Sequence, residues 1–218
     1  MTKFKLSLIL VIATAFSIPA LAADTVVKRV PAGAVAFHFV YDLTLVPPPG
    51  ELVGYIAFIE GVDSSLFNGL PSKDTAHFTV RVTQPLPPPS PLPVERDPAL
   101  VALLFPPGGQ FTVFYDAEPT SRDWSDPDTF SRGVPIAVFD ESALLNTMAF
   151  GPFPGIGMNV FSSKLVESTA INLNGQKLDF NRMVPYGVTI TNFGNAGRPD
   201  SLGAAGGGTA ISIGGNVR

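Results

Sequence analysis

The 218-residue chain contains no cysteine. This absence excludes disulfide bridges, thiolate metal ligands and cysteine nucleophiles, so the fold depends on its apolar core and its hydrogen bonds. Charged residues make up only 15% of the chain, and the formal net charge is −4. Because a net-negative chain without a basic stripe repels phosphate backbones, the sequence argues against a nucleic-acid partner.

The chain is also poor in residues that often carry catalysis. His38 and His77 are its two histidines, and it has no Gly-x-Ser-x-Gly elbow of the hydrolase type. Apolar residues are abundant at 45%, and there are 22 prolines and 21 glycines. This composition is far from that of a disordered chain and is typical of a domain with short elements and many turns.

The first 22 residues have the three-part pattern of a cleavable secretory signal. Lys3 and Lys5 precede an apolar run over residues 6–16, and Pro19 and small residues follow up to Ala22. The run is shorter than the roughly 20 residues that a membrane-spanning helix needs. We therefore expect cleavage after Ala22, export to the periplasm or the extracellular space, and no transmembrane helix. Since no cysteine follows the run, we expect no lipoprotein-type anchor.

Alternation of apolar and polar residues predicts strands along residues 23–218. It is clearest in Thr75–Thr83, and Asn174-Gly175 between two other segments is a strong signal for a type I′ hairpin. The segments of this kind are 37–41, 53–59, 75–83, 111–115, 135–139, 158–166, 169–173, 177–180, 188–193 and 209–213. About eight or nine short strands predict a single all-β domain with at most one short helix. An antiparallel β-barrel is the first expectation and a β-sandwich is the alternative.

Three segments lack this alternation. Residues 99–105 are apolar on every side and fit either a short helix after Asp97-Pro98 or a buried strand. Residues 84–93 are rich in proline, which predicts an extended polyproline II surface loop. Residues 202–215 are rich in glycine without the Lys-Ser/Thr of a phosphate-binding loop, and we expect a flexible approach to a last strand or a tail.

An acidic loop surrounds Trp124. Asp123, Asp126 and Asp128 could supply oxygen ligands to Ca²⁺, the one metal ion that the sequence suggests. Their spacing does not match an EF-hand loop. Asp126-Pro127-Asp128 equally fits an ordinary turn whose carboxylates bond to their own backbone, so a calcium site and a solvated loop both remain open.

Aromatic residues on the predicted strands suggest a second kind of site. Phenylalanines there either pack as a core or line an apolar cavity in a barrel of about eight strands. The candidate ligand-binding residues are His38, Tyr41, Tyr55, Tyr115 and Trp124. An exposed Trp124 could stack on a flat ligand, although such a residue more often lies back over the end of the core.

Several stretches carry a resemblance. Residues 67–72 (FNGLPS), 75–79 (TAHFT), 123–131 (DWSDPDTFS) and 180–187 (FNRMVPYG) resemble small exported bacterial proteins of unassigned function. This resemblance spans most of the chain after residue 22 and implies no activity. The expected strand plan also resembles, in architecture alone, the lipocalin and allene-oxide-cyclase type barrels, and architecture does not determine function.

These observations lead to three functional hypotheses. The first is a non-enzymatic exported barrel that binds a small apolar or amphipathic ligand. The second is a structural or surface-interaction protein without a ligand. The third is a cyclase-like or isomerase-like barrel enzyme that uses phenolic, histidine or carboxylate side chains, Glu60 among them, in the barrel interior. No cofactor is indicated by any motif.

Overall fold

The structure, a computed structural model, describes residues 25–44, 51–83, 90–93, 100–142, 144–149, 155–198 and 203–214. The predicted signal over residues 1–22 lies outside these residues. So do residues 84–89 of the proline-rich segment.

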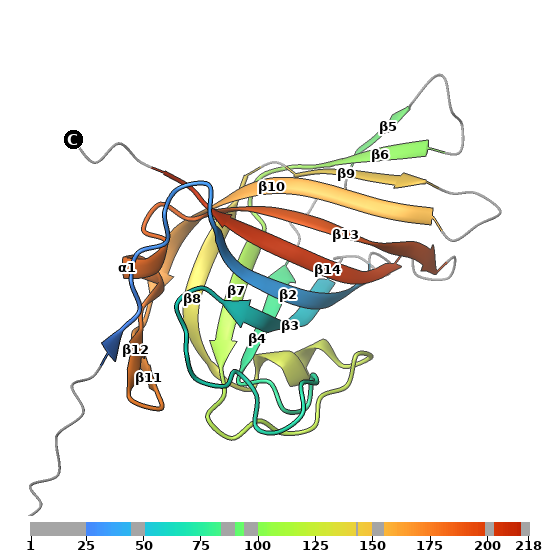
Figure 1. Ribbon diagram of the computed structural model, residues 1–218. Helices are drawn as coiled ribbons and strands as arrows, with labels where there is room; N and C mark the ends of the chain where they lie inside the picture. Colours follow the sequence, from blue (N-terminus) through green and yellow to red (C-terminus); the bar gives the residue numbers. More distant parts are fainter. Residues whose placement is uncertain are drawn as a thin grey trace, which may run out of the picture.

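Eight antiparallel strands close into a barrel, which confirms the predicted fold class (Figure 1). Strand β14 pairs with β2 on one edge and with β13 on the other, and β10 pairs with both β13 and β8. Because no edge of this ring is left unpaired, the sandwich alternative is excluded. The barrel strands are β2 (Val35–Thr44), β3 (Glu51–Ile59), β4 (Phe78–Thr83), β7 (Gln110–Tyr115), β8 (Val134–Glu141), β10 (Gly155–Ser168), β13 (Val188–Arg198) and β14 (Gly203–Ser212).

Strand β10 closes the ring and also leaves it. Along residues 163–168 it pairs with β8, whereas along residues 157–160 the same edge pairs with β9 (Leu144–Ala149). Strand β9 pairs in turn with β6 (Leu100–Phe105), and β6 pairs with β5 (Ser90–Pro93). Strands β5, β6 and β9 therefore form an extension that projects beyond the closed barrel at the upper right of Figure 1.

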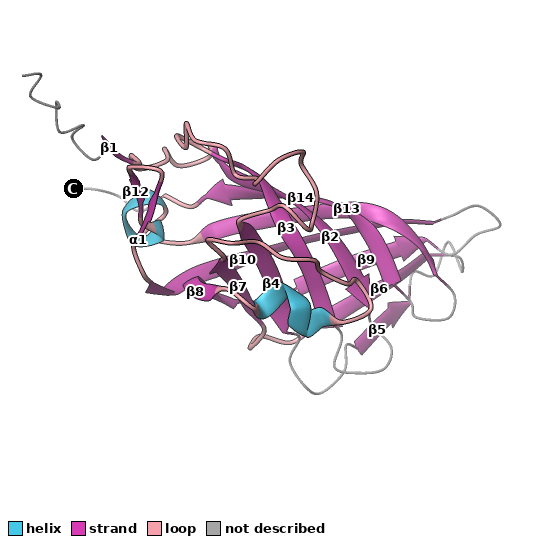
Figure 2. Ribbon diagram, turned by 90° about the horizontal axis from the view of Figure 1, so that it is seen from below, coloured by secondary structure: helices cyan, strands magenta, loops and turns pink. Residues whose placement is uncertain are grey.

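Small elements cover the opposite end of the barrel. Strands β1 (Thr25–Val26), β11 (Ile171–Leu173) and β12 (Gln176–Leu178) form a separate sheet beside the short helix α1 (Phe180–Met183). The predicted hairpin turn is confirmed, since Asn174 and Gly175 have φ values of 51° and 84°. A 3₁₀ turn, η1 (Pro127–Ser131), lies beside β4 in the β7–β8 connection (Figure 2). Among the described residues, no helix could cross a membrane.

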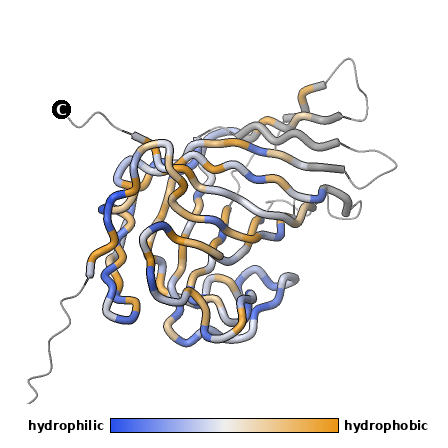
Figure 3. Tube along the Cα trace, in the orientation of Figure 1, coloured by the Kyte–Doolittle hydropathy of each residue, from blue (hydrophilic) through white to orange (hydrophobic). Residues whose placement is uncertain are grey.

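Phenylalanine rings fill the barrel near α1. Phe37 lies with ring centroids 5.9 Å from Phe111 and 6.1 Å from Phe180, and Phe111 lies 6.0 Å from Phe139. None of these side chains has any exposed surface, so no space the size of a water molecule touches them. At this end of the barrel the rings pack as a core rather than lining a cavity. Figure 3 shows the hydrophobic residues concentrated along the strands that surround them.

Two of the expectations for the segments without alternation are wrong. For the third segment, the structure decides between a helix and a strand. Residues 90–93 form strand β5 instead of a polyproline II loop. Its prolines are tolerated because β5 lies at the edge of the sheet and pairs only with β6. Residues 100–105 form strand β6, the strand alternative for that apolar segment. Most of the glycine-rich segment is β14, a central barrel strand, rather than a flexible approach or a tail.

Packing explains why β14 is rich in glycine. Gly208 pairs with Asn192 on one side and with Phe39 on the other, so all three side-chain positions lie in one row inside the barrel. A Cβ atom at Gly208 would come within 2.2 Å of both the Asn192 Oδ1 atom and the Phe39 ring. At the neighbouring Gly207, by contrast, the nearest atom would be 3.7 Å away. The inward glycine therefore gives the larger side chains on both sides their room.

We expect Gly208→Ala to lower the free energy of unfolding by about 1–3 kcal/mol, because the new methyl group overpacks the row. Gly207→Ala is the matched control and should leave stability unchanged or slightly raised, since it adds a methyl group without a clash. Urea denaturation of both variants measures the difference. Equal midpoints for the two variants would contradict the inward orientation of Gly208.

Candidate functional site

The predicted ligand-binding residues do not converge. His38 is exposed on the outside of the barrel, where its Nδ1 atom lies 2.9 Å from the Thr209 Oγ1 atom. Tyr55 points to the opposite side of β3 from the fully buried Ile56. Of the five predicted residues, Tyr41 is the one whose side chain is buried in the barrel core, with 3% of its surface exposed.

The other two predicted residues are packing residues. Tyr115 is half-buried, with its ring centroid 5.3 Å from that of Phe78. Trp124 stacks on Phe130, with the centroids 4.9 Å apart, and Phe130 is fully buried. Trp124 therefore lies back over the barrel wall, as expected from the more common behaviour of such residues, and its stacked face is not free for a ligand.

The acidic loop does not form the suggested calcium site. Asp123 accepts hydrogen bonds from the backbone N–H and the hydroxyl of Ser125, which lower the pKa of its carboxyl. Asp128 forms an ion pair with Arg81 on β4, at 2.8 Å. Asp126 joins Asp123 through a backbone hydrogen bond. Within the described ranges, no group of three or more His, Asp or Glu side chains is arranged to hold a metal ion.

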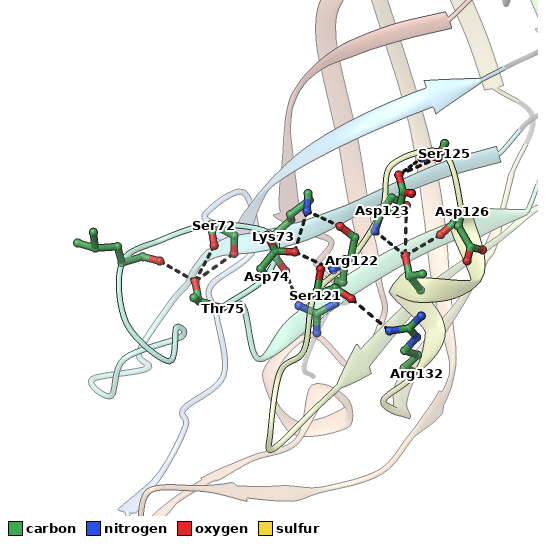
Figure 4. Close-up of polar contacts among 12 residues, drawn as sticks. Ser72, Lys73, Asp74, Thr75, Ser121, Arg122, Asp123, Ser125, Asp126 and Arg132 are labelled. Atoms are coloured by element: carbon green, nitrogen blue, oxygen red, sulfur yellow. Dashed lines mark hydrogen bonds and ion pairs between the residues drawn. The ribbon is translucent and has the colours of Figure 1, made fainter.

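Instead, polar residues of this region hold two long connections together (Figure 4). Arg122 is 3% exposed, and its guanidinium bonds to the Lys73 carbonyl oxygen and pairs with Asp116 at 3.4 Å. The backbone N–H of Arg122 donates to the Asp74 carboxylate at 2.7 Å, which is the largest cause of the lowered pKa of Asp74. The β3–β4 and β7–β8 connections are thereby fastened to each other, and the network has a structural role.

A different set of polar residues lies inside the barrel. Glu141, Asn159, Ser163 and Asn192 each expose 7% of their surface or less. Each also has a buried side-chain oxygen without a hydrogen-bond partner in the described part of the chain. Together with Tyr41, we call these four residues the interior polar cluster.

Strand register explains how the cluster assembles. Ser163 on β10 pairs directly with Glu141 on β8, and Asn159 on β10 pairs directly with Asn192 on β13. Paired residues project from the same side of a sheet with their Cβ atoms about 5 Å apart. Because Phe161 lies between Asn159 and Ser163 on the same face, the cluster consists of two polar pairs separated by one apolar side chain.

Two glycines beside Glu141 and Tyr41 make room for the cluster. A Cβ atom at Gly109 would lie 2.4 Å from a Glu141 carboxylate oxygen, and a Cβ atom at Gly194 would lie 2.8 Å from the Tyr41 hydroxyl oxygen. Both polar groups thus rest against backbone that no side chain covers. Gly109, directly before β7, and Gly194, on β13, are therefore part of the construction of the site.

Burial controls the ionisation of the cluster. Desolvation raises the pKa of Glu141 to about 8 and that of Tyr41 to about 12. At neutral pH the Glu141 carboxyl is therefore mainly protonated, and the Tyr41 phenol is neutral. A protonated carboxyl can donate a hydrogen bond as well as accept one, and it becomes a carboxylate if a cation is brought beside it.

Four of the five cluster residues were not predicted from the sequence, and their positions on the strands explain why. Glu141 follows Phe139 by two positions, and Asn192 follows Ile190 by two, so both occupy the apolar face of their strands. A polar residue in phase with core residues is the signal that could have found them. The members of the cluster are instead spread over several strands and are not grouped along the chain.

Comparisons with known protein families, with curated proteins and with solved structures gave no match for this chain. A separate pocket of about 250 Å³ lies beside α1, lined in part by Ser168 and Asp179. Its Ser168 and Asp179 side chains already have partners, since the Ser168 hydroxyl donates to Asp179 and Asp179 caps α1. The interior polar cluster is therefore the candidate site, and its geometry and chemistry carry the interpretation.

The raised pKa of Glu141 predicts how stability depends on pH. In the unfolded chain this carboxyl ionises near its ordinary pKa of 4.5, whereas in the folded chain it ionises near about 8. Below the lower pKa, the protonated Glu141 carboxyl makes its full contribution to the free energy of unfolding. As pH rises from the lower pKa to the higher one, this contribution is lost at about 1.4 kcal/mol per pH unit. Glu141→Gln removes this component, so the variant should gain stability relative to the unmodified protein between these two values. Urea denaturation across the range measures it, and parallel curves would contradict it.

Proposed function

We propose that this protein binds a small amphipathic molecule inside the barrel, with a hydrogen-bond-donating group of the ligand at the interior polar cluster. The observation that carries the proposal is the set of buried oxygens without partners on Glu141, Asn159, Ser163 and Asn192. We also propose that the protein is exported and not an enzyme. The leader pattern supports the first point, and the absence of a catalytic motif from the sequence supports the second.

Energetics support a ligand that donates hydrogen bonds. Each buried polar atom without a partner costs about 1–3 kcal/mol of stability. Three of the four unpartnered atoms are carboxyl or amide oxygens, which accept hydrogen bonds, and the fourth is the Ser163 hydroxyl. A ligand that supplies the donors removes this cost on binding, and the free energy recovered contributes to the binding affinity.

Charge supports an amine as the donating group. Among the described residues, no lysine, arginine or histidine forms an ion pair with Glu141. An ammonium group beside Glu141 would supply several donors and a positive charge, and the carboxyl would then release its proton and ionise. The apolar part of the ligand would lie along Phe161.

One observation favours a second candidate, an isomerase or cyclase. A carboxyl held neutral by burial and a neutral phenol both belong to the barrel interior, and a neutral carboxyl can act as a general acid. The other groups considered for such chemistry count against it. His38 and Glu60 are exposed, and Tyr55 points away from the core. Binding without turnover therefore remains the stronger proposal.

Titration calorimetry with octylamine tests the binding proposal. We expect octylamine to bind more tightly than octanol or octanoate, and Glu141→Gln to weaken octylamine about tenfold through loss of a charge-assisted hydrogen bond. At neutral pH the binding should release the Glu141 proton, so the measured enthalpy should change with the ionisation enthalpy of the buffer. The Gln variant should lose this buffer dependence.

Asp140→Asn is the matched control. Asp140 is the exposed neighbour of Glu141 on β8, points to the outside of the barrel and accepts a hydrogen bond from Gln110. Its replacement should leave octylamine affinity unchanged. Absence of octylamine binding, or equal weakening by both variants, would contradict a site at Glu141.

A further inference from the structure

The outside of the barrel wall changes in polarity along β10. In the half toward α1, Phe161 and Ser163 are buried inside the barrel, whereas Ser162 and Lys164 are exposed outside it. Toward the extension, Asn159 is buried inside, whereas Met158 and Val160 expose 57% and 46% of their surfaces outside. The outside of one strand thus changes from polar to apolar within a few residues.

Strand β13 inverts at the same level. Ile190 is fully buried and pairs with Phe161, whereas Asn192 is buried inside and pairs with Asn159. Beyond Asn192, Phe193 lies outside, pairs with Met158 and exposes 64% of its surface. Because the change falls at paired positions of neighbouring strands, it is a property of this side of the wall and not of a single residue.

The apolar outside continues over the extension. Register passes from β10 through β9 to β6 and β5, which brings Leu104 and Leu92 to the same face of the sheet as Met158 and Val160. Leu104 and Leu92 are 40% and 41% exposed. We call this surface the outer apolar face, and its described members are Leu92, Leu104, Met158, Val160 and Phe193.

Charge is scarce along the strands that carry this surface. The sequences of β5, β6 and β9, and of β10 before Lys164, contain no charged residue, and β13 contains one, Arg198, at its last position. In the other half of β10 charge returns with Lys164, whose side chain is exposed. The uncharged surface therefore coincides with the region where the polarity of the wall is inverted.

We propose that the outer apolar face rests in the acyl-chain region of a lipid bilayer, so that the protein is membrane-associated along one side of its barrel. Apolar residues outside and polar residues inside are the arrangement that hydrocarbon favours for a β-wall, and the uncharged face complements an uncharged phase. The face spans part of the closed barrel wall, on β10 and β13, and the extension, on β5 and β6 (Figure 1). This inference is independent of the ligand proposed for the interior.

Vesicle flotation tests the proposal with the full chain and phosphatidylcholine vesicles. We expect the protein to float with vesicles also at high salt, because the contact is apolar. Phe193→Asp combined with Val160→Asp should lower the bound fraction about tenfold or more. Phe58→Asp is the matched control, since Phe58 is 40% exposed on β3 outside this face, and it should bind normally. The leader is the same in every variant, so it does not affect the comparison.

A reporter keeps the test informative if the charged variants fail to fold. Trp124→Phe removes the single tryptophan, and Phe193→Trp then introduces one on the outer apolar face. Brominated acyl chains should quench this reporter but not one introduced by Phe58→Trp. Absence of quenching at position 193 would overturn the proposal. So would sedimentation showing that the face pairs two copies, with vesicle binding equal in the original and charged proteins.

Discussion

The rest of the structure depends on the two-sided pairing of β10. This strand joins β13 along residues 155–163 and β8 along residues 163–168, and the second contact closes eight strands into a ring. Closure pairs the backbone hydrogen-bonding groups of the ring strands with one another. The fold therefore holds together without disulfide bridges, which a chain without cysteine cannot form. It also gives every ring strand an inside and an outside, so each alternate side chain is either desolvated or exposed.

The interior polar cluster is a consequence of that closure. Glu141 has an unusual pKa because the ring removes it from water and, in the described residues, provides no cation beside it. Space for the cluster comes from glycines at paired positions, as with Gly208 between Asn192 and Phe39. Phenylalanines fill the end near α1, and Phe161 lies between the two polar pairs of the cluster.

Both proposals rest on one part of the barrel wall that is polar inside and apolar outside. The ligand proposal concerns its inner side, and the membrane proposal concerns its outer side. Asn159 and Asn192 face inward at the level where Met158 and Phe193 face outward. An apolar outside and a polar inside are unfavourable for a barrel surrounded by water. They become favourable when hydrocarbon covers the outside and a hydrogen-bonding ligand occupies the inside, and each of these can be tested without the other.

The sequence by itself determined the local features of this protein. Period-2 alternation predicted most barrel strands and the all-β class, and Asn174-Gly175 predicted its hairpin, because these properties depend on near neighbours along the chain. Tertiary structure alone decided which polar residues share an environment. Glu141 meets Ser163, and Asn159 meets Asn192, through strand register that no local pattern specifies. The glycine-rich segment became a central strand for the same reason, since its glycines are needed by side chains on neighbouring strands.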